Sequence, residues 1–142
     1  MKLLIFLMFV ASSSFAKSAE DIHCLALNIY HESRGEPQEG QLAVAHVTLN
    51  RVASSSFPNT VCKVVWQRKQ FSWTHDGKSD KPHNNKAWET SKRLAKTAVK
   101  WYNSGEDLSQ GSLYFHTPTV SPSWAKSFKR VMRIGDHIFY KP

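Results

Sequence analysis

The first apolar positions of the domain recur at helical spacing. They fall at intervals of three and four residues: Ile22, Leu25, Ala26, Ile29 and Tyr30. Ser18 is followed by Asp21, which is typical of a helix start. We expect the helix to end near Ser33, because Gly35 suits a left-handed cap and Pro37 forces its predecessor into an extended conformation.

A second helix follows at once, with Pro37 suited to its first position. Its apolar positions form one stripe that three further residues widen to most of the circumference: Leu42, Ala45, Leu49 and Val52, with Ala43, Val44 and Val47. A helix that is apolar nearly all round is typical of a protein core. The segment "HESRGEP" is therefore predicted to be a tight corner between an amphipathic helix and a central buried one.

The rest of the chain is predicted to contain a short helix, a long loop, a third long helix and then strands. A short helical piece is expected over 61–66, and the polar stretch 67–84 is predicted to be a long loop. Asn85 can cap a third long helix that Gly105 ends. Beyond it, "SLYFHTP" reads as a strand and "KRVMRIGDHIFYKP" as a hairpin turning at Gly135. The predicted architecture is α+β, mainly helical, with a small C-terminal antiparallel element.

The N-terminus has the pattern of a secretory signal peptide. Lys2 is followed by the apolar run "LLIFLMFV" and the small-x-small site Ser14-Phe15-Ala16. We expect residues 1–16 to be removed and residues 17–142 to form one domain, secreted or periplasmic. An uncleaved anchor is the alternative, although the apolar run is short for a bilayer span.

The chain has two cysteines, Cys24 and Cys62. In an oxidising compartment, a lone pair of cysteines in a small domain can form a disulfide. Two reduced core cysteines are the equal alternative, because sequence does not report their separation.

The net charge is +8, from 19 Lys and Arg against 11 Asp and Glu. A basic, tryptophan-rich exported domain suits an anionic polymer, whether nucleic acid, acidic glycan or bacterial wall. The densest basic group is spaced as an ordinary solvated helix face: Lys92, Arg93, Lys96 and Lys100. Charge alone does not choose among these partners.

Glu32 is the strongest candidate for acid catalysis. It falls at the C-terminal end of the first helix, where the helix dipole and partial burial both favour the protonated carboxyl. A carboxyl that stays protonated near neutral pH suits a general acid. The alternative is a solvated glutamate at a helix end. Arg34 is expected to pair with a carboxylate or to cap helix carbonyls, and Glu36 to lie at the helix junction.

A metal site is not predicted. "HESRG" begins like the H-E-x-x-H zinc signature, but Gly35 stands where its second histidine belongs. The seven histidines are scattered without ligand spacing: His23, His31, His46, His75, His83, His116 and His137. We expect no cofactor.

Several aromatic residues fall in polar or strand-edge contexts: Phe71, Trp73, Tyr114, Phe115 and Trp124. Aromatic planes stack on the apolar faces of sugar rings, and Gln70, Ser72 and His116 can bind hydroxyl or acetamido groups. The alternative is a satellite hydrophobic cluster.

Together, four segments resemble the cell wall hydrolase family of the spore cortex-lytic enzymes (SleB/CwlJ type). They are "ALNIYHESRGEPQEGQLAVAHVTLNRV", "FPNTVCKVVWQRKQFSW", "SLYFHTP" with a later Trp, and "IGDHIFY". The resemblance runs from about Asp21 to Tyr140, and its first block is the most specific. Ser33 stands where many members carry alanine.

The resemblance implies a lysozyme-like fold that cleaves the glycan strand of peptidoglycan between muramic acid and glucosamine, with Glu32 as the catalytic acid. It favours a lytic transglycosylase, which needs one carboxylate where ordinary glycosidases use two. Glu36 is the nearest second carboxylate, and Glu39 and Asp76 are weaker candidates. The cleft-lining residues are expected to be Glu36, Gln70, Phe71, Ser72, Trp73, Tyr114, His116 and Trp124.

Peptidoglycan is then the expected partner, with no nucleic acid, no stable membrane insertion after cleavage of the leader, and a monomeric state. Two rival functions remain open. A metal-dependent wall amidase or peptidase would use the histidines, and a non-catalytic glycan-binding protein would keep the aromatic residues without needing Glu32.

Overall fold

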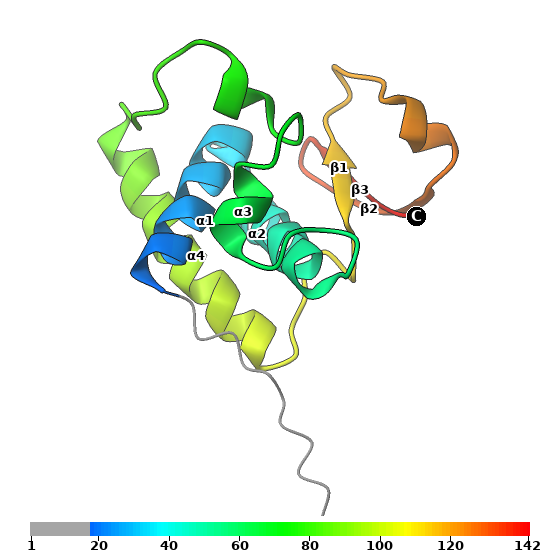
Figure 1. The fold of residues 1–142 in the computed structure, drawn as a ribbon, viewed down its shortest axis with the longest axis horizontal. Helices are drawn as coiled ribbons and strands as arrows, with labels where there is room; N and C mark the ends of the chain where they lie inside the picture. The colour runs from blue at the N-terminus through cyan, green and yellow to red at the C-terminus, as the bar shows by residue number, and fades with distance from the viewer. Residues whose placement is uncertain (1–17) are drawn as a thin grey trace, which may run out of the picture.

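The computed structural model describes residues 18–142, so the predicted signal peptide lies outside the described residues. The elements follow in the order α1 (Ala19–Ser33), α2 (Gln38–Ala53), α3 (Val61–Val65), η1 (Ser72–His75), α4 (Asn85–Asn103), β1 (Tyr114–His116), η2 (Ser123–Lys126), β2 (Lys129–Ile134) and β3 (His137–Lys141). Figure 1 shows the helices gathered on one side and the sheet on the other. The predicted α+β architecture is confirmed. No helix within 18–142 is long and apolar enough to cross a membrane.

The predicted start and end of α1 are confirmed. The Ser18 hydroxyl accepts a hydrogen bond from the Asp21 N–H at 3.1 Å, which caps the helix. Gly35 follows the helix with φ at +83°, the left-handed conformation that glycine adopts most easily. Pro37 stands just before α2, so that helix begins one residue later than predicted.

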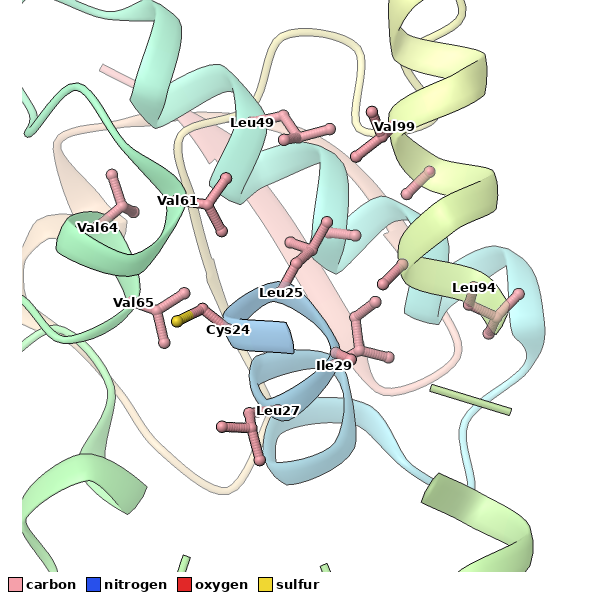
Figure 2. Close-up of a cluster of buried hydrophobic side chains, with 14 of the residues drawn as sticks. Cys24, Leu25, Leu27, Ile29, Leu49, Val61, Val64, Val65, Leu94 and Val99 are labelled. Carbon is pink, nitrogen blue, oxygen red and sulfur yellow. The ribbon is translucent and has the colours of Figure 1, made fainter. Parts of the chain in front are cut away.

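The core lies among the four helices, with α2 buried on nearly every side as predicted. Figure 2 shows Leu25 and Ile29 of α1 in one cluster with Leu49 of α2, Val61 of α3 and Leu94 of α4, and Ile29 lies on the side toward α4. These side chains are almost wholly removed from solvent. The hydrophobic effect therefore fixes α1 between its three neighbours.

The sheet packs against the opposite side of α2. Its strand order is β1-β3-β2, with both pairs antiparallel, and the β2–β3 hairpin turns at Gly135-Asp136 as predicted. Phe139 of the central strand packs on Ala43, Val44 and Val47 of α2. One helix thus supports both the helical core and the sheet.

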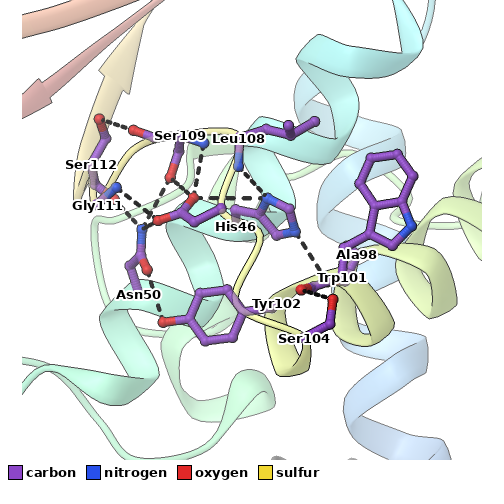
Figure 3. Close-up of polar contacts among 11 residues, drawn as sticks. His46, Asn50, Ala98, Trp101, Tyr102, Ser104, Leu108, Ser109, Gly111 and Ser112 are labelled. Carbon is purple, nitrogen blue, oxygen red and sulfur yellow. Dashed lines mark hydrogen bonds and ion pairs between the residues drawn. The ribbon is translucent and has the colours of Figure 1, made fainter.

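A buried polar network joins α2 to the segment that leads into β1 (Figure 3). The His46 Nδ1 accepts the Leu108 N–H at 2.9 Å, so its Nε2 carries the proton and donates to the Ala98 carbonyl at 3.0 Å. Burial lowers the pKa of His46, which keeps the ring neutral. Asn50 donates to Asp107 at 2.9 Å and accepts from the Tyr102 hydroxyl at 2.8 Å. These bonds hold the chain where it leaves α4 for the sheet.

The structure joins Cys24 of α1 to Cys62 of α3, with the two Cα atoms 5.2 Å apart. Of the two alternatives left by the sequence, the structure adopts the disulfide. The bond links the first helix to the short helix that precedes the long loop.

We predict that the exported protein is stabilised by this disulfide. Its removal in a Cys24→Ser/Cys62→Ser variant is expected to lower the free energy of unfolding by about 3–4 kcal/mol in the chain-entropy model, because the bond closes a loop with a sequence separation of 38. Denaturant unfolding of both proteins measures the difference. Thiol titration of the unfolded, unreduced wild type is the direct check, and two reactive thiols would refute the bridge.

Candidate active site

The last turn of α1 is held by its own side chains. The Ser33 hydroxyl donates to the Ile29 carbonyl at 2.8 Å. Arg34 donates to the Tyr30 carbonyl at 3.1 Å, and its guanidinium lies 4.6 Å from the centre of the Tyr30 ring. Of the two expectations for Arg34, the capping of a helix carbonyl is therefore the one observed.

The same turn is bound to the long loop and to α4. His31 hydrogen bonds to the Asp80 carbonyl at 2.9 Å, and its ring stacks on Trp73 with the centroids 4.5 Å apart. The Tyr30 hydroxyl accepts the Asn84 N–H at 3.0 Å, at the start of α4. The backbone of Glu32 is thereby fixed before its side chain meets any substrate.

The Glu32 side chain lines a cleft of about 590 Å³. The other lining residues come from α2, from the loop around η1, and from the region between β1 and β3: Arg51, Lys69, Gln70, Phe71, Ser72, His75, Tyr114, Phe115, His116, Thr117, Val120, Pro122, Trp124 and His137. The loop around η1 and the stretch from β1 to η2 therefore supply most of the lining, to which the helices add Glu32 and Arg51.

Burial raises the pKa of Glu32 from 4.5 to about 7, and the nearby positive charge of Arg51 opposes the rise. At neutral pH a large fraction of this carboxyl is protonated. It can give up a proton and then, as a carboxylate, take one back. The predicted protonated carboxyl thus has a physical basis in desolvation.

Arg51 is the buried cation of the site, with 4% of its surface exposed. It donates to the Leu113 carbonyl at 2.8 Å, and its guanidinium lies 5.4 Å from the centre of the Tyr114 ring. Burial lowers its pKa to about 10, so it stays charged at neutral pH. Arg51 and Glu32 form no direct ion pair, which leaves the carboxyl free to carry its proton.

His137 supports Glu32 from the sheet side. Its Nε2 donates to the Glu32 carbonyl oxygen at 3.1 Å. Its Nδ1 is buried without a hydrogen bond and lies 3.8 Å from the Glu36 carboxylate. Burial lowers the pKa of His137, although Glu36 opposes the shift. His137 thus fixes the end of α1 through a main-chain contact.

Glu36 lies in a second hollow, of about 380 Å³, which adjoins the cleft. The two hollows share Glu32, Thr117 and His137. Glu36 accepts the Asp136 N–H at 3.3 Å, and a Cβ added at Gly135 would collide with its carboxylate. Its observed contacts therefore hold the hairpin against the α1–α2 corner.

Most of the predicted cleft residues do line the cleft, namely Gln70, Phe71, Ser72, Tyr114, His116 and Trp124. They are not equally available to a ligand. Phe71 is buried, and the amide oxygen of Gln70 accepts from Arg51 at 3.4 Å. His116 donates through Nδ1 to the Thr117 carbonyl and accepts at Nε2 from the Tyr140 hydroxyl. Both of its ring nitrogens are thus occupied by the protein itself.

Two of the predicted cleft residues do not line the cleft: Glu36, which lies in the adjoining hollow, and Trp73. Trp73 is buried, and its indole N–H donates to Asn28 at 2.9 Å. One side stacks on His31 and another contacts Trp66, so Trp73 belongs to the hydrophobic cluster rather than to the cleft lining. A tryptophan in a polar loop looks exposed in the sequence, but here the loop folds over α1.

Sequence reasoning missed Arg51 and His137 as parts of the site. The available signal for Arg51 was a charged residue near the end of a helix predicted to be buried on most sides. Nothing local singles out His137, whose role depends on the packing of the hairpin. Lys69 and Thr117 were likewise not anticipated, although both line the cleft.

Glu32 is the only carboxylate lining the cleft among residues 18–142. Glu39 and Asp76, the weaker candidates for a second acid, line neither hollow, and Asp76 accepts the Lys78 N–H at 2.9 Å. Within the same range, no three His, Cys, Asp or Glu side chains converge in a way that could hold a metal ion.

Curated proteins with similar sequences are spore cortex-lytic enzymes. The spore cortex-lytic enzyme of Bacillus cereus is 40% identical over 125 residues, which cover 87% of this chain and 45% of that protein. The Bacillus subtilis spore cortex-lytic enzyme is 38% identical over 123 residues, covering 86% of this chain and 38% of the relative. The chain thus spans less than half the length of these curated relatives.

Two solved structures match this chain over nearly their whole length, unlike the curated relatives. The catalytic domain of the germination-specific lytic transglycosylase SleB from Bacillus anthracis superposes with a TM-score of 0.75 at 39% identity, over 89% of this chain and 98% of that one. The catalytic domain of Bacillus cereus SleB gives a TM-score of 0.75 at 38% identity, over 89% and 94%. A family model described as Cell Wall Hydrolase matches residues 35–140. The chain therefore belongs to the Cell Wall Hydrolase family.

Proposed function

We propose that this domain cleaves the glycan strand of peptidoglycan between muramic acid and glucosamine, as a lytic transglycosylase with Glu32 as its one catalytic carboxyl. One observation carries the proposal. Glu32 lines the cleft with its pKa raised to about 7, and no second carboxylate shares that cleft within the described chain. The family and the similarity to lytic enzymes support the same choice.

A single carboxyl suffices because it acts twice. Protonated Glu32 donates its proton to the glycosidic oxygen as the bond to the muramic C1 breaks. The resulting carboxylate then removes the proton of the C6 hydroxyl of the same muramic residue, whose oxygen attacks C1 and closes a 1,6-anhydro ring. Glu32 ends protonated, and no water is consumed. Arg51 stabilises the transient carboxylate through its buried positive charge.

The setting of the enzyme follows from the same proposal. We infer that residues 1–16 direct export and that the mature domain acts at the cell wall as a monomer. The positive charge of the chain, +8 over its full length, favours approach to an anionic wall. Tyr114 and Trp124 supply aromatic surfaces for the sugar rings, while Ser72 is exposed and offers a hydroxyl.

We predict that Glu32→Gln abolishes strand cleavage, because the amide preserves the shape of the side chain but has no proton to transfer. The expected loss in kcat/KM exceeds the roughly 10²–10⁴-fold of a single acid–base step, since the same group serves both steps. Release of soluble fragments from purified peptidoglycan measures it. Glu39→Gln, an exposed glutamate outside both hollows, is the matched control and should keep full activity. More than about a tenth of the wild-type activity in Glu32→Gln, a change of only ~1.4 kcal/mol, would refute the assignment.

The products distinguish the mechanisms. We expect digested strands to end in 1,6-anhydro-muramic acid, one water lighter than a hydrolytic reducing end, and Glu36→Gln to keep that product. Mass spectrometry of the fragments released by the wild type and by Glu36→Gln identifies the end group in each case.

Reducing ends that disappear in Glu36→Gln would instead make Glu36 a second acid or base. Cleavage confined to the peptide stems and lost in chelator would favour the metal-dependent rival, and binding without any cleavage would favour the glycan-binding one.

We predict that the free energy of unfolding depends on pH through Glu32, and that Glu32→Gln removes this dependence. The folded pKa of about 7 lies above the unfolded value of 4.5, so the folded state holds the proton over a range where the unfolded chain has lost it. Stability therefore falls as the pH rises from about 4.5 to 7. The loss is expected to be about 1–3 kcal/mol after allowance for partial solvent access.

Denaturant midpoints of wild type and Glu32→Gln at pH 5 and pH 8 test this. The stability of the wild type should fall more between pH 5 and pH 8 than that of Glu32→Gln. The stability of Glu39→Gln should change with pH as that of the wild type does. Parallel curves for wild type and Glu32→Gln would contradict the raised pKa.

A further inference from the structure

A further hollow, of about 480 Å³, continues the cleft beyond its loop wall. It is lined by Trp66, Arg68, Lys69, Thr74 and His75. Lys69 and His75 also line the cleft that contains Glu32, so the two spaces share a wall. We call this hollow the loop hollow. Its position at the edge of the cleft places it on the path of any polymer that extends past Glu32 in that direction.

Trp66 presents an aromatic surface at this hollow. It has 45% of its surface exposed, and only one other large hydrophobic residue of the described chain, Val120, is as open. Trp66 contacts Trp73 at a centroid distance of 5.1 Å, and Trp73 is in turn fixed by Asn28 and His31. The indole of Trp66 is therefore partly exposed and is held in place by an edge contact with a fixed neighbour. Such a plane suits stacking against the apolar face of a sugar ring.

Lys69 adds charge and an unusual backbone. Its φ is +64°, a conformation that residues with a side chain rarely adopt and that clusters at functional sites. Neither Lys69 nor Arg68 forms an ion pair with any carboxylate of residues 18–142, and no carboxylate lines the loop hollow. Two unneutralised cations beside an exposed aromatic plane fit a sugar that carries a negative charge.

We propose that the loop hollow is an accessory subsite for a muramic acid unit farther along the strand. Its ring would stack on Trp66, and its carboxylate, from the lactyl group or the attached peptide, would pair with Lys69 and Arg68. The identity of the ligand rests on the proposed function, because muramic acid is the anionic sugar of peptidoglycan glycan strands. The subsite would hold a long strand across Glu32 without taking part in bond cleavage.

The test separates the subsite from the catalytic step. Trp66→Leu removes the plane, and Lys69→Asn removes the charge with a residue that tolerates positive φ. Trp101→Leu, a partly buried tryptophan of α4, and Lys63→Asn, an exposed lysine of α3, are the matched controls, since neither lines the loop hollow. All four are compared for folding by circular dichroism and then for cleavage of long strands and of a muramic-acid-containing tetrasaccharide.

For long strands, Trp66→Leu is expected to raise KM about 3- to 10-fold, as loss of one aromatic contact implies, with kcat nearly unchanged. Lys69→Asn is expected to raise KM about 2- to 5-fold, as for a partly exposed ion pair. In this proposal the tetrasaccharide lies within the cleft around Glu32, so Trp66→Leu should leave its cleavage unchanged. Lys69 lines the cleft as well, so Lys69→Asn is judged on long strands only. Amidation of the strand carboxylates should erase the effect of Lys69→Asn and leave that of Trp66→Leu.

Binding to inactive protein makes the result independent of catalysis. Calorimetry with solubilised long strands compares Glu32→Gln with Glu32→Gln/Trp66→Leu and Glu32→Gln/Lys69→Asn, and the double variants should bind more weakly by the same factors. Unchanged binding in both overturns the subsite, even if the wild type cleaves strands normally. Equal losses with poly(glycerol phosphate) would also overturn it in favour of a general anion patch. If the wild type cleaves no glycan while these binding losses occur, the catalytic proposal fails and the subsite stands.

Discussion

The last turn of α1 is the point where three distant parts of the chain meet. Tyr30 accepts a hydrogen bond from the start of α4, His31 bonds to the long loop, and the carbonyl of Glu32 accepts from His137 of the sheet. Three consecutive residues are therefore each fixed by a different segment. Because the core already packs α1 between α2, α3 and α4, the turn cannot move without disturbing both the loop and the sheet.

This constraint explains the chemistry of Glu32. A carboxyl held at a packed junction loses much of its hydration, which is the main cause of its raised pKa. A direct ion pair with Arg51 would pull the pKa back down and tie up the proton. The guanidinium is instead engaged by the Leu113 carbonyl and by surrounding aromatic rings, so it opposes the rise only in part. Burial of this carboxyl lowers the stability of the fold near neutral pH, and the same burial keeps a transferable proton on Glu32.

The features predictable from the sequence were those that depend on near neighbours. The cap at Ser18, the left-handed Gly35 and the hairpin at Gly135 follow from short-range backbone preferences, and all are present. The sequence did not indicate that Arg51 belongs to the site, and the prediction that Trp73 lines the cleft was wrong. Both have a different cause. Which side of a buried helix faces a cleft, and which way a polar loop folds over it, depend on contacts between segments far apart in the sequence. The family resemblance pointed to Glu32, but only tertiary packing accounts for its pKa.

The location of Glu32 also bears on how a strand would lie. The cleft and the hollow beside Glu36 share Glu32, Thr117 and His137, so the acid stands where the two spaces join rather than at a closed end. A polymer bound there can extend in both directions from the bond to be cut. In the proposed function, this geometry favours cleavage within a strand over removal of terminal units. An acid at the junction also keeps its partial burial only while the segments that line the cleft, mainly the loop around η1 and the stretch from β1 to η2, remain in place.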